Sequence, residues 1–156
     1  MLEAYTLAAD AFTSTAEERA AEPESFWVNR IAGASGQSAA FGAFVGQDLV
    51  GTVALEFAAK PKTRHKGLVI GMYVRPHARG TGAGKALLAA AVAFARARHG
   101  IHLLNLTVTE GNEPAVKLYR SFGFEVFGTE PMAICTPCGY KAKIHMWLPL
   151  TSAQTH

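Results

Sequence analysis

The pattern of apolar and polar residues predicts strands that alternate with helices. Short apolar runs, bounded by glycine, proline or polar residues, are typical of strands. These runs are Tyr5–Leu7, Phe41–Val45, Leu49–Phe57, Leu68–Val74, Leu103–Thr109, Phe124–Phe127 and Ile144–Leu148. The segment Gly46-Gln47-Asp48 predicts a hairpin. The pair Arg75-Pro76 predicts the end of a strand, because proline cannot donate to a central ladder.

Helical signals predict helices over Asp10–Arg19, Pro23–Ala32, Gly82–His99 and Asn112–Phe122. The third is the clearest, because Leu88, Val92 and Ala95 share one stripe of an alanine-rich segment and Gly100 can end it. Asn112 is a favoured N-cap residue. Strands and helices in this order predict a mixed sheet with helices on its faces, an α/β or α+β domain.

Length and composition limit the classes of protein. A chain of 156 residues is in the range of one domain, so we expect a single unit over residues 1–156. No segment reaches the roughly 18 consecutive apolar residues of a membrane span, and the start lacks the pattern of a secretory signal. We therefore expect a cytoplasmic protein without a membrane partner. The net charge is +3 and the basic residues are dispersed, which does not indicate a nucleic-acid partner.

The two cysteines form a C-x-x-C motif, Cys135-Thr136-Pro137-Cys138. Three readings are open: half of a zinc site, a redox pair, or the tip of a hairpin. Two thiolates cannot complete a tetrahedral zinc site, and the helical context of a thioredoxin-like pair is missing. We therefore expect a turn, and no metal.

A glycine-rich turn follows the strand that ends at Val74 and opens the alanine-rich helix. Its sequence is V-R-P-H-A-R-G-T-G-A-G-K, from Val74 to Lys85. Backbone amides at a helix N-terminus bind phosphate oxygens, and glycine lets them approach closely. A P-loop would need Gly at Arg79 and Ser or Thr at Ala86, and the dinucleotide fingerprint also fails on its third glycine. The turn therefore predicts a phosphorylated ligand of another kind.

The turn fits R-x-x-G-x-G, written as Arg79, Gly82 and Gly84, and so resembles the acetyl-CoA motif of the GNAT acetyltransferases. A second GNAT-like signature follows, with Asn112 opening a helix that ends in L-Y-x-x-x-G-F at Phe124. The resemblance covers about Leu68 to Phe127. It implies a mostly antiparallel mixed sheet of about 6–7 strands with about four helices.

The resemblance also implies the ligand and the residues that hold it. Acetyl-CoA would be the co-substrate, bound through these residues: Met72, Tyr73, Val74, Arg79, Gly80, Thr81, Gly82, Ala83, Gly84, Lys85, Asn112 and Tyr119. The amides from Gly80 to Lys85 would hold the pyrophosphate, and the strand backbone and Asn112 would hold the pantetheine arm. The amide of Val74 would be the oxyanion donor, and Tyr119 would protonate the leaving thiolate. Asn112 could instead be only a cap, and Tyr119 only a packed aromatic.

The general base and the acceptor site are less defined. Relatives that acetylate ribosomal proteins carry a Glu where this chain has Thr107, so the resemblance supplies no base at that position. Glu56 is the leading candidate, as a base or part of a water relay, and Glu110, His65 and His145 are the others. Phe26, Trp27 and Arg30 could line the acceptor site, or be core aromatics and a solvated arginine.

We therefore expect an N-acetyltransferase that acts on the primary amine of a small molecule, such as an amino acid or an antibiotic. A peptide or protein N-terminal acetyltransferase and a catalytically silent acyl-CoA-binding module are the alternatives. An α-amine is a better acceptor than a lysine when no strong base is present, because its lower pKa leaves more of it neutral. A homodimer is a possible assembly.

Overall fold

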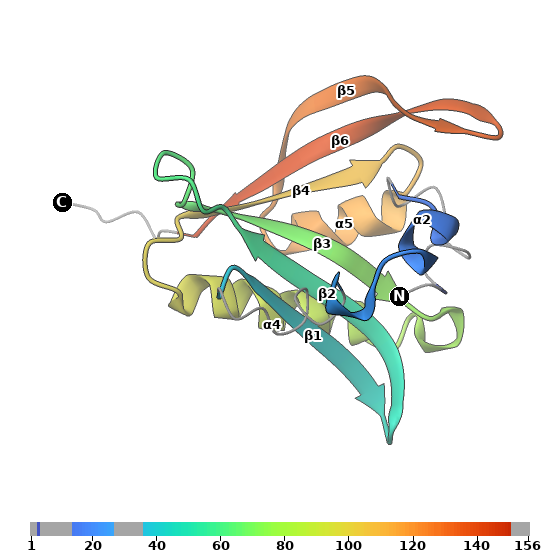
Figure 1. Ribbon diagram of the computed structural model, residues 1–156, viewed down its shortest axis with the longest axis horizontal. Helices are drawn as coiled ribbons and strands as arrows, with labels where there is room; N and C mark the ends of the chain where they lie inside the picture. The colour runs from blue at the N-terminus through green and yellow to red at the C-terminus, as the bar shows by residue number, and fades with distance from the viewer. Residues whose placement is uncertain (1–2, 4–13, 27–35, 151–156) are drawn as a thin grey trace. The chain divides into compact units, whose positions relative to one another are not determined.

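The computed structural model describes residues 3, 14–26 and 36–150, and it has the mixed sheet and flanking helices that the sequence predicts (Figure 1). In the described residues the sheet has six strands in the order β1-β2-β3-β4-β6-β5. The chain divides into two compact units, one of residues 1–22 and 105–148 and the other of residues 23–104 and 149–156.

The unit of residues 23–104 and 149–156 is built on an antiparallel meander. Its elements are β1 (Ser38–Val45), β2 (Asp48–Phe57), β3 (Lys66–Val74), a short 3-10 helix (Pro76–Ala78) and α4 (Ala83–Ala97). The helix α4 lies along one face of β1, β2 and β3 (Figure 1). Its predicted stripe is buried, and Leu87 and Ala91 widen it. The rings of Phe41 and Phe57 contact Phe94 of α4, with 5.6 and 6.3 Å between centroids.

A β-bulge interrupts the pairing of β2 with β3. Thr52 is opposite Tyr73, but Ala54 is opposite Ile70, so β3 carries one more residue than β2 across this stretch. Gly71 has φ of 61°, a left-handed conformation that glycine adopts readily. The hydroxyl of Thr52 donates to the carbonyl of Gly71 at 3.0 Å. The backbone at Gly71 and Met72 therefore leaves the regular ladder just before the strand ends.

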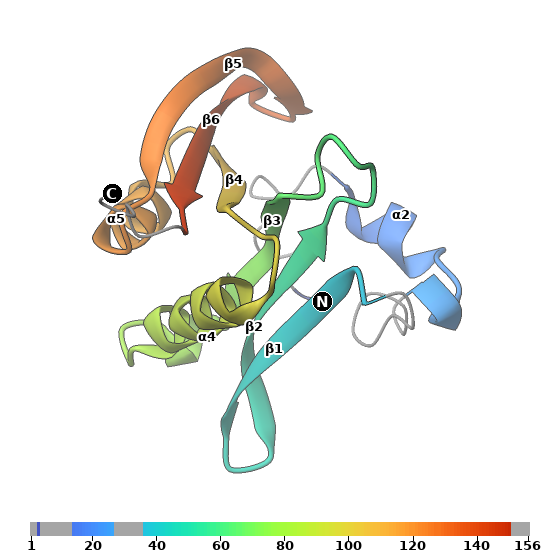
Figure 2. The ribbon, with the colours of Figure 1, turned by 90° about the vertical axis from the view of Figure 1, so that its left-hand side faces the viewer.

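The unit of residues 1–22 and 105–148 contains α5 against one face of a β-hairpin (Figure 2). Its elements are α2 (Ala16–Ala20), most of β4 (Leu103–Thr109), α5 (Glu113–Ser121), β5 (Glu125–Thr136) and nearly all of β6 (Gly139–Pro149). Phe124 and Met146 are fully buried in its core. A Cβ at Gly123, just after α5, would lie 3.3 Å from the Leu148 side chain, so α5 is on the Leu148 face of β6.

The strands β4 and β6 run antiparallel. The amide of Glu110 donates to the carbonyl of Ala142 at 3.0 Å, and the amide of Leu150 donates to the carbonyl of His102 at 2.8 Å. The same number of residues separates the two bonds on each strand, so the register between them is regular. This register places Thr107 opposite His145. The two form a non-hydrogen-bonded pair, whose Cα atoms are typically about 4.5 Å apart with side chains on one face.

The structure corrects three sequence-based boundaries. The last two strands are longer than predicted, because a register shift between Glu130 and Ile134 accommodates Pro131 within β5. Within the helix predicted over Asp10–Arg19, Ser14 and Thr15 are not helical and α2 begins at Ala16, because Thr15 and Glu18 form a capping box. Residues 10–13 lie outside the described residues. The C-x-x-C motif is the tip of the β5–β6 hairpin, and both thiols are exposed. Tyr5–Leu7 and most of the helix predicted over Pro23–Ala32 lie outside the described residues.

Candidate active site

The glycine turn presents a row of unused backbone amides. In the described part of the chain, none of the amides from Gly80 to Lys85 donates to an acceptor, and the first helical bond of α4 is from Ala86 to Gly82 at 2.9 Å. The N-cap, Gly82, supplies no side chain to satisfy them. The N-terminus of a 15-residue helix carries a partial positive charge behind these amides. The turn is therefore built to accept an anion.

The turn is also open to an approaching ligand. Gly80 and Gly82 have φ of 77° and 88°, which other L residues rarely adopt. A Cβ built at either position would meet no atom within 4 Å. These glycines are therefore required by backbone conformation rather than by packing, and the space above them can receive phosphate groups.

Arg79 ties the turn to the end of β3. Its Nε donates to the carbonyl of Val74 at 3.0 Å, and its guanidinium carbon lies 5.9 Å from the centre of the Tyr73 ring. The Tyr73 hydroxyl is buried and has no hydrogen-bond partner in the described part of the chain. Both residues thus position the strand end, and the Tyr73 hydroxyl is an unused donor beside it.

Asn112 uses only half of its amide as a helix cap. Its Oδ1 accepts the amide of Ala115 at 3.3 Å, and its side-chain nitrogen has no acceptor among the described residues. Asn112 is exposed. The cap is confirmed, and the same side chain can still donate to a ligand.

Substituting Asn112 separates these two functions. We expect Asn112→Asp to change the free energy of unfolding by less than about 0.5 kcal/mol, because aspartate caps as well as asparagine. It removes the amide donor, so we expect acetyl-CoA affinity to fall about 10-fold, as for one lost hydrogen bond. Asn112→Ala should lower both quantities, with about 1 kcal/mol lost in stability. Urea unfolding and calorimetry measure them, and equal affinities for Asn112→Asp and wild type would leave Asn112 as a cap alone.

Tyr119 lies in α5 with its side chain buried against Phe124, at 5.8 Å between ring centroids. Burial raises the pKa of Tyr119 to about 12, because the anionic form loses hydration. The phenol therefore stays protonated at neutral pH and can act as a proton donor rather than a base.

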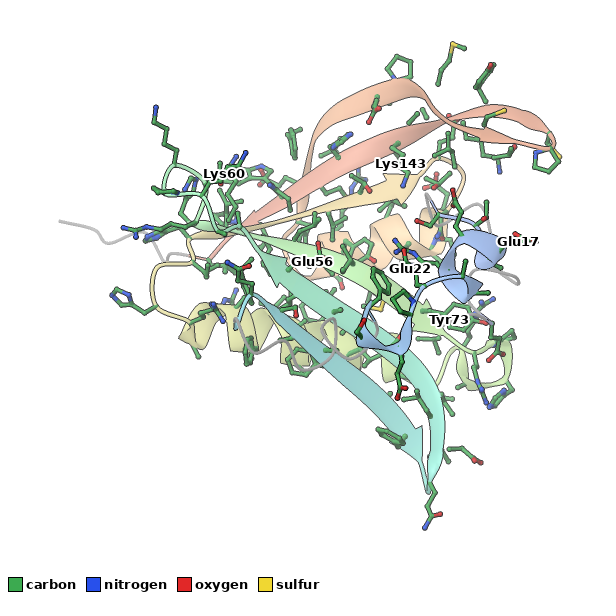
Figure 3. All side chains as sticks on the ribbon, in the orientation of Figure 1. Glu17, Glu22, Glu56, Lys60, Tyr73 and Lys143 are labelled. Carbon is green, nitrogen blue, oxygen red and sulfur yellow. The ribbon has the colours of Figure 1, made fainter. Side chains whose placement is uncertain are left out.

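Glu56 is exposed near the carboxyl end of β2. It lies four residues beyond Thr52, the partner of Tyr73, which is roughly 13 Å along the strand. Figure 3 shows Glu56 and Tyr73 well apart along adjacent strands. Glu56 could therefore serve a group held at the end of β3 only through water. Of the acceptor candidates, Phe26 is half-buried, and Trp27 and Arg30 lie outside the described residues.

A polar group on β5 and β6 has a geometry that the sequence did not reveal. The Nε2 of His145 lies 3.1 Å from Oε2 of Glu130, and the ring of Phe127 is 5.8 Å from the imidazole. Lys143 is directly opposite Glu130. Burial lowers the pKa of Lys143, while the negative charge of Glu130 acts to raise it. His145 was one of several base candidates, but nothing in the sequence pairs it with Glu130.

The described residues contain no group of three or more histidines, cysteines or acidic residues placed to hold a metal ion. Among them there is also no helix with the length and apolar character of a membrane span.

Comparison with known proteins gives the same family for sequence and fold. The chain matches the acetyltransferase (GNAT) family over residues 1–124. The L-methionine sulfoximine/L-methionine sulfone acetyltransferase of Pseudomonas paraeruginosa is 36% identical over 83 residues, which are 53% of this chain and 44% of that protein. The chain thus spans less than half the length of this curated relative.

Two solved structures share the fold. A GNAT acetyltransferase of Streptococcus pneumoniae has a TM-score of 0.80 at 23% identity, and covers 96% of this chain and 89% of its own. The ribosomal-protein-alanine N-acetyltransferase of Brucella melitensis has a TM-score of 0.77 at 26% identity, and covers 95% of this chain and 91% of its own. With the family match over most of its length, this chain belongs to the acetyltransferase (GNAT) family.

Proposed function

We propose that this protein transfers an acetyl group from acetyl-CoA to the primary amine of a small molecule, with an α-amino acid or a related amine as acceptor. The proposal that acetyl-CoA is the acetyl donor rests mainly on one observation. Six consecutive amides at the N-terminus of α4 have no acceptor among the described residues, and two open glycines stand among them.

The residues present fit a coenzyme that carries a diphosphate. The amides of Gly80, Thr81, Gly82, Ala83, Gly84 and Lys85 would hold the pyrophosphate. Arg79 would fix the turn on Val74, and the Tyr73 hydroxyl would gain a partner. The bulge at Gly71 leaves the backbone of Met72 without a partner on β2. The pantetheine arm would pair with the backbone of Met72 and Val74, as the family resemblance implies, and Asn112 would also contact it.

Acetyl-CoA would supply an activated acyl group and a thiolate leaving group. The Val74 amide, or a close neighbour, would stabilise negative charge on the acyl oxygen. One such donor is worth about 3 kcal/mol. Tyr119 would give its proton to the departing sulfur. Glu56 is one candidate for the base, and it would reach the acceptor only through water.

The acceptor class rests on the relative from Pseudomonas paraeruginosa, which is named for two α-amino acids, L-methionine sulfoximine and L-methionine sulfone. An α-amine needs less help to lose its proton than a lysine does. The Brucella structure favours a second candidate, N-terminal acetylation of a ribosomal protein. Thr107 weakens that candidate, because the resemblance places a glutamate there.

A thiol-release assay tests this proposal. The protein is mixed with acetyl-CoA and a panel of L-methionine sulfone, other free amino acids, aminoglycosides and alanine-ending peptides. We expect saturable thiol release with a free amine, and mass spectrometry should find an acetylated product. Release with peptides alone would move the assignment to N-terminal acetylation. Tight acetyl-CoA binding without release for any amine would instead indicate a silent binding module.

A further inference from the structure

We propose that His145, held by Glu130, is the general base that takes a proton from the acceptor amine. This inference rests on the proposed acetyl transfer and adds the residue that removes the proton. The supporting observation is a carboxylate–imidazole pair, with 3.1 Å between Glu130 Oε2 and His145 Nε2, on strands that the chain brings together only in the folded state.

The contact sets the proton positions on the imidazole. Glu130 accepts a hydrogen bond from Nε2, which leaves the lone pair on Nδ1. His145 has no other hydrogen-bond partner among the described residues, so Nδ1 is available to a substrate. This is the arrangement of a base oriented by a carboxylate.

The neighbours of His145 leave room for a ligand on its face of the strands. Its partner on β5 is Gly128, and a Cβ built there would meet no atom within 4 Å. Its partner on β4 is Thr107, which is exposed and whose hydroxyl is not basic at neutral pH. Phe127 borders the imidazole as an exposed aromatic wall. Of the three neighbouring residues Thr107, Gly128 and His145 on β4, β5 and β6, only His145 therefore has a basic side chain.

The strand register relates His145 to the other proposed groups of its own unit. Thr107, opposite His145, precedes Glu110 by three residues, roughly 10 Å of strand, and Asn112 follows that turn directly. Tyr119 belongs to α5, which packs on the Leu148 face of β6, whereas His145 is on the opposite face. The proposed proton donor and proton acceptor therefore lie on opposite faces of β4 and β6.

Acetyl transfer with these residues accounts for each proton and for each bond that forms or breaks. The acceptor ammonium gives a proton to His145 Nδ1, and its nitrogen lone pair then forms the C–N bond to the acyl carbon. The C–S bond breaks, and its electron pair stays on sulfur. Tyr119 gives its proton to the sulfur, and the second proton of the nitrogen returns to Tyr119 through water. The imidazolium releases its own proton to water. One proton is released per turnover.

The charged groups around the imidazole are few among the described residues. On β5 it faces Glu130, and on its own strand Lys143 is opposite that carboxylate. The side chains of β4 on this face, Asn105, Thr107 and Thr109, carry no charge.

Two acceptors of different basicity test the proposal in the full-length protein. L-Methionine sulfone has a protonated α-amine, whereas hydroxylamine is mostly unprotonated at neutral pH and needs no base. We expect His145→Gln to lower kcat/KM for the amino acid about 100-fold and for hydroxylamine less than 3-fold. Glu130→Gln, which keeps an acceptor without its charge, should lose about 10-fold on the amino acid alone. His99→Gln, an exposed histidine beyond α4, is the control.

Each outcome has one meaning. Equal losses on both acceptors, with normal acetyl-CoA binding by calorimetry, would show a purely structural role and overturn the proposal. So would a selective loss in Glu56→Gln when His145→Gln shows none. If wild type acetylates no amine, the proposed function itself fails, because the variants then have no activity to compare.

Discussion

Gly82→Asp is expected to lower the affinity for acetyl-CoA by about 100-fold or more. The substitution places a carboxylate among the amides that would hold the diphosphate. Two like charges about 4 Å apart repel by about 4 kcal/mol at an effective dielectric constant of 20, and mobile ions reduce this. Titration calorimetry with acetyl-CoA measures the loss.

The same helix supplies a matched control for this prediction. Gly100, beyond the other end of α4, is exposed and has φ of 84°, and a Cβ built on it would meet no atom within 4 Å. Gly100→Asp therefore introduces the same residue in a similar backbone conformation, away from the glycine turn. We expect it to leave affinity within about 2-fold of wild type. Equal affinity for the two variants would show that the turn does not bind the coenzyme.

Tyr119→Phe is expected to lower kcat about 100-fold while acetyl-CoA affinity changes less than about 2-fold. The raised pKa of Tyr119, about 12, determines how its proton can be transferred. A free thiol has a pKa near 8.5, so a complete transfer from this phenol is uphill by about 5 kcal/mol. The proton must therefore move while the C–S bond is breaking. Tyr140→Phe, at an exposed tyrosine, is the control for the steady-state assay.

The same variant tests the burial of Tyr119 through stability at alkaline pH. The folded pKa is about 12 and the unfolded value is 10.0, so the unfolded state loses its proton first. The stabilising contribution is complete below pH 10 and is lost as pH rises from 10 to 12. It amounts to about 2.7 kcal/mol. Urea unfolding should show this decline in wild type relative to Tyr119→Phe, and parallel curves would mean that the phenol is hydrated.

The sequence predicted those parts of the site that depend on local backbone chemistry. The glycine turn, the stripe of α4 and the cap at Asn112 follow from spacing and from residue conformation, which neighbours along the chain decide. The pair of Glu130 and His145 could not be predicted from local spacing, because it depends on the register of β5 with β6. That register includes a shift near Pro131. The same proline is the reason why the sequence predicted too short a β5. The Gly71 bulge had one local signal, a glycine inside an apolar strand.

The extra residue at Gly71 and Met72 changes which face each following side chain occupies. Val74 is opposite Gly51 and lies toward Leu87 of α4, so Tyr73 is on the other face, together with Thr52 and Glu56. If β3 kept all its residues in an uninterrupted ladder, Tyr73 would face α4 and Val74 would be on the opposite face. A phenol would then press on the helix, and a valine would replace the ring beneath Arg79. The bulge therefore decides that Tyr73, and not Val74, is the residue beneath Arg79, without changing any residue of the phosphate-binding turn.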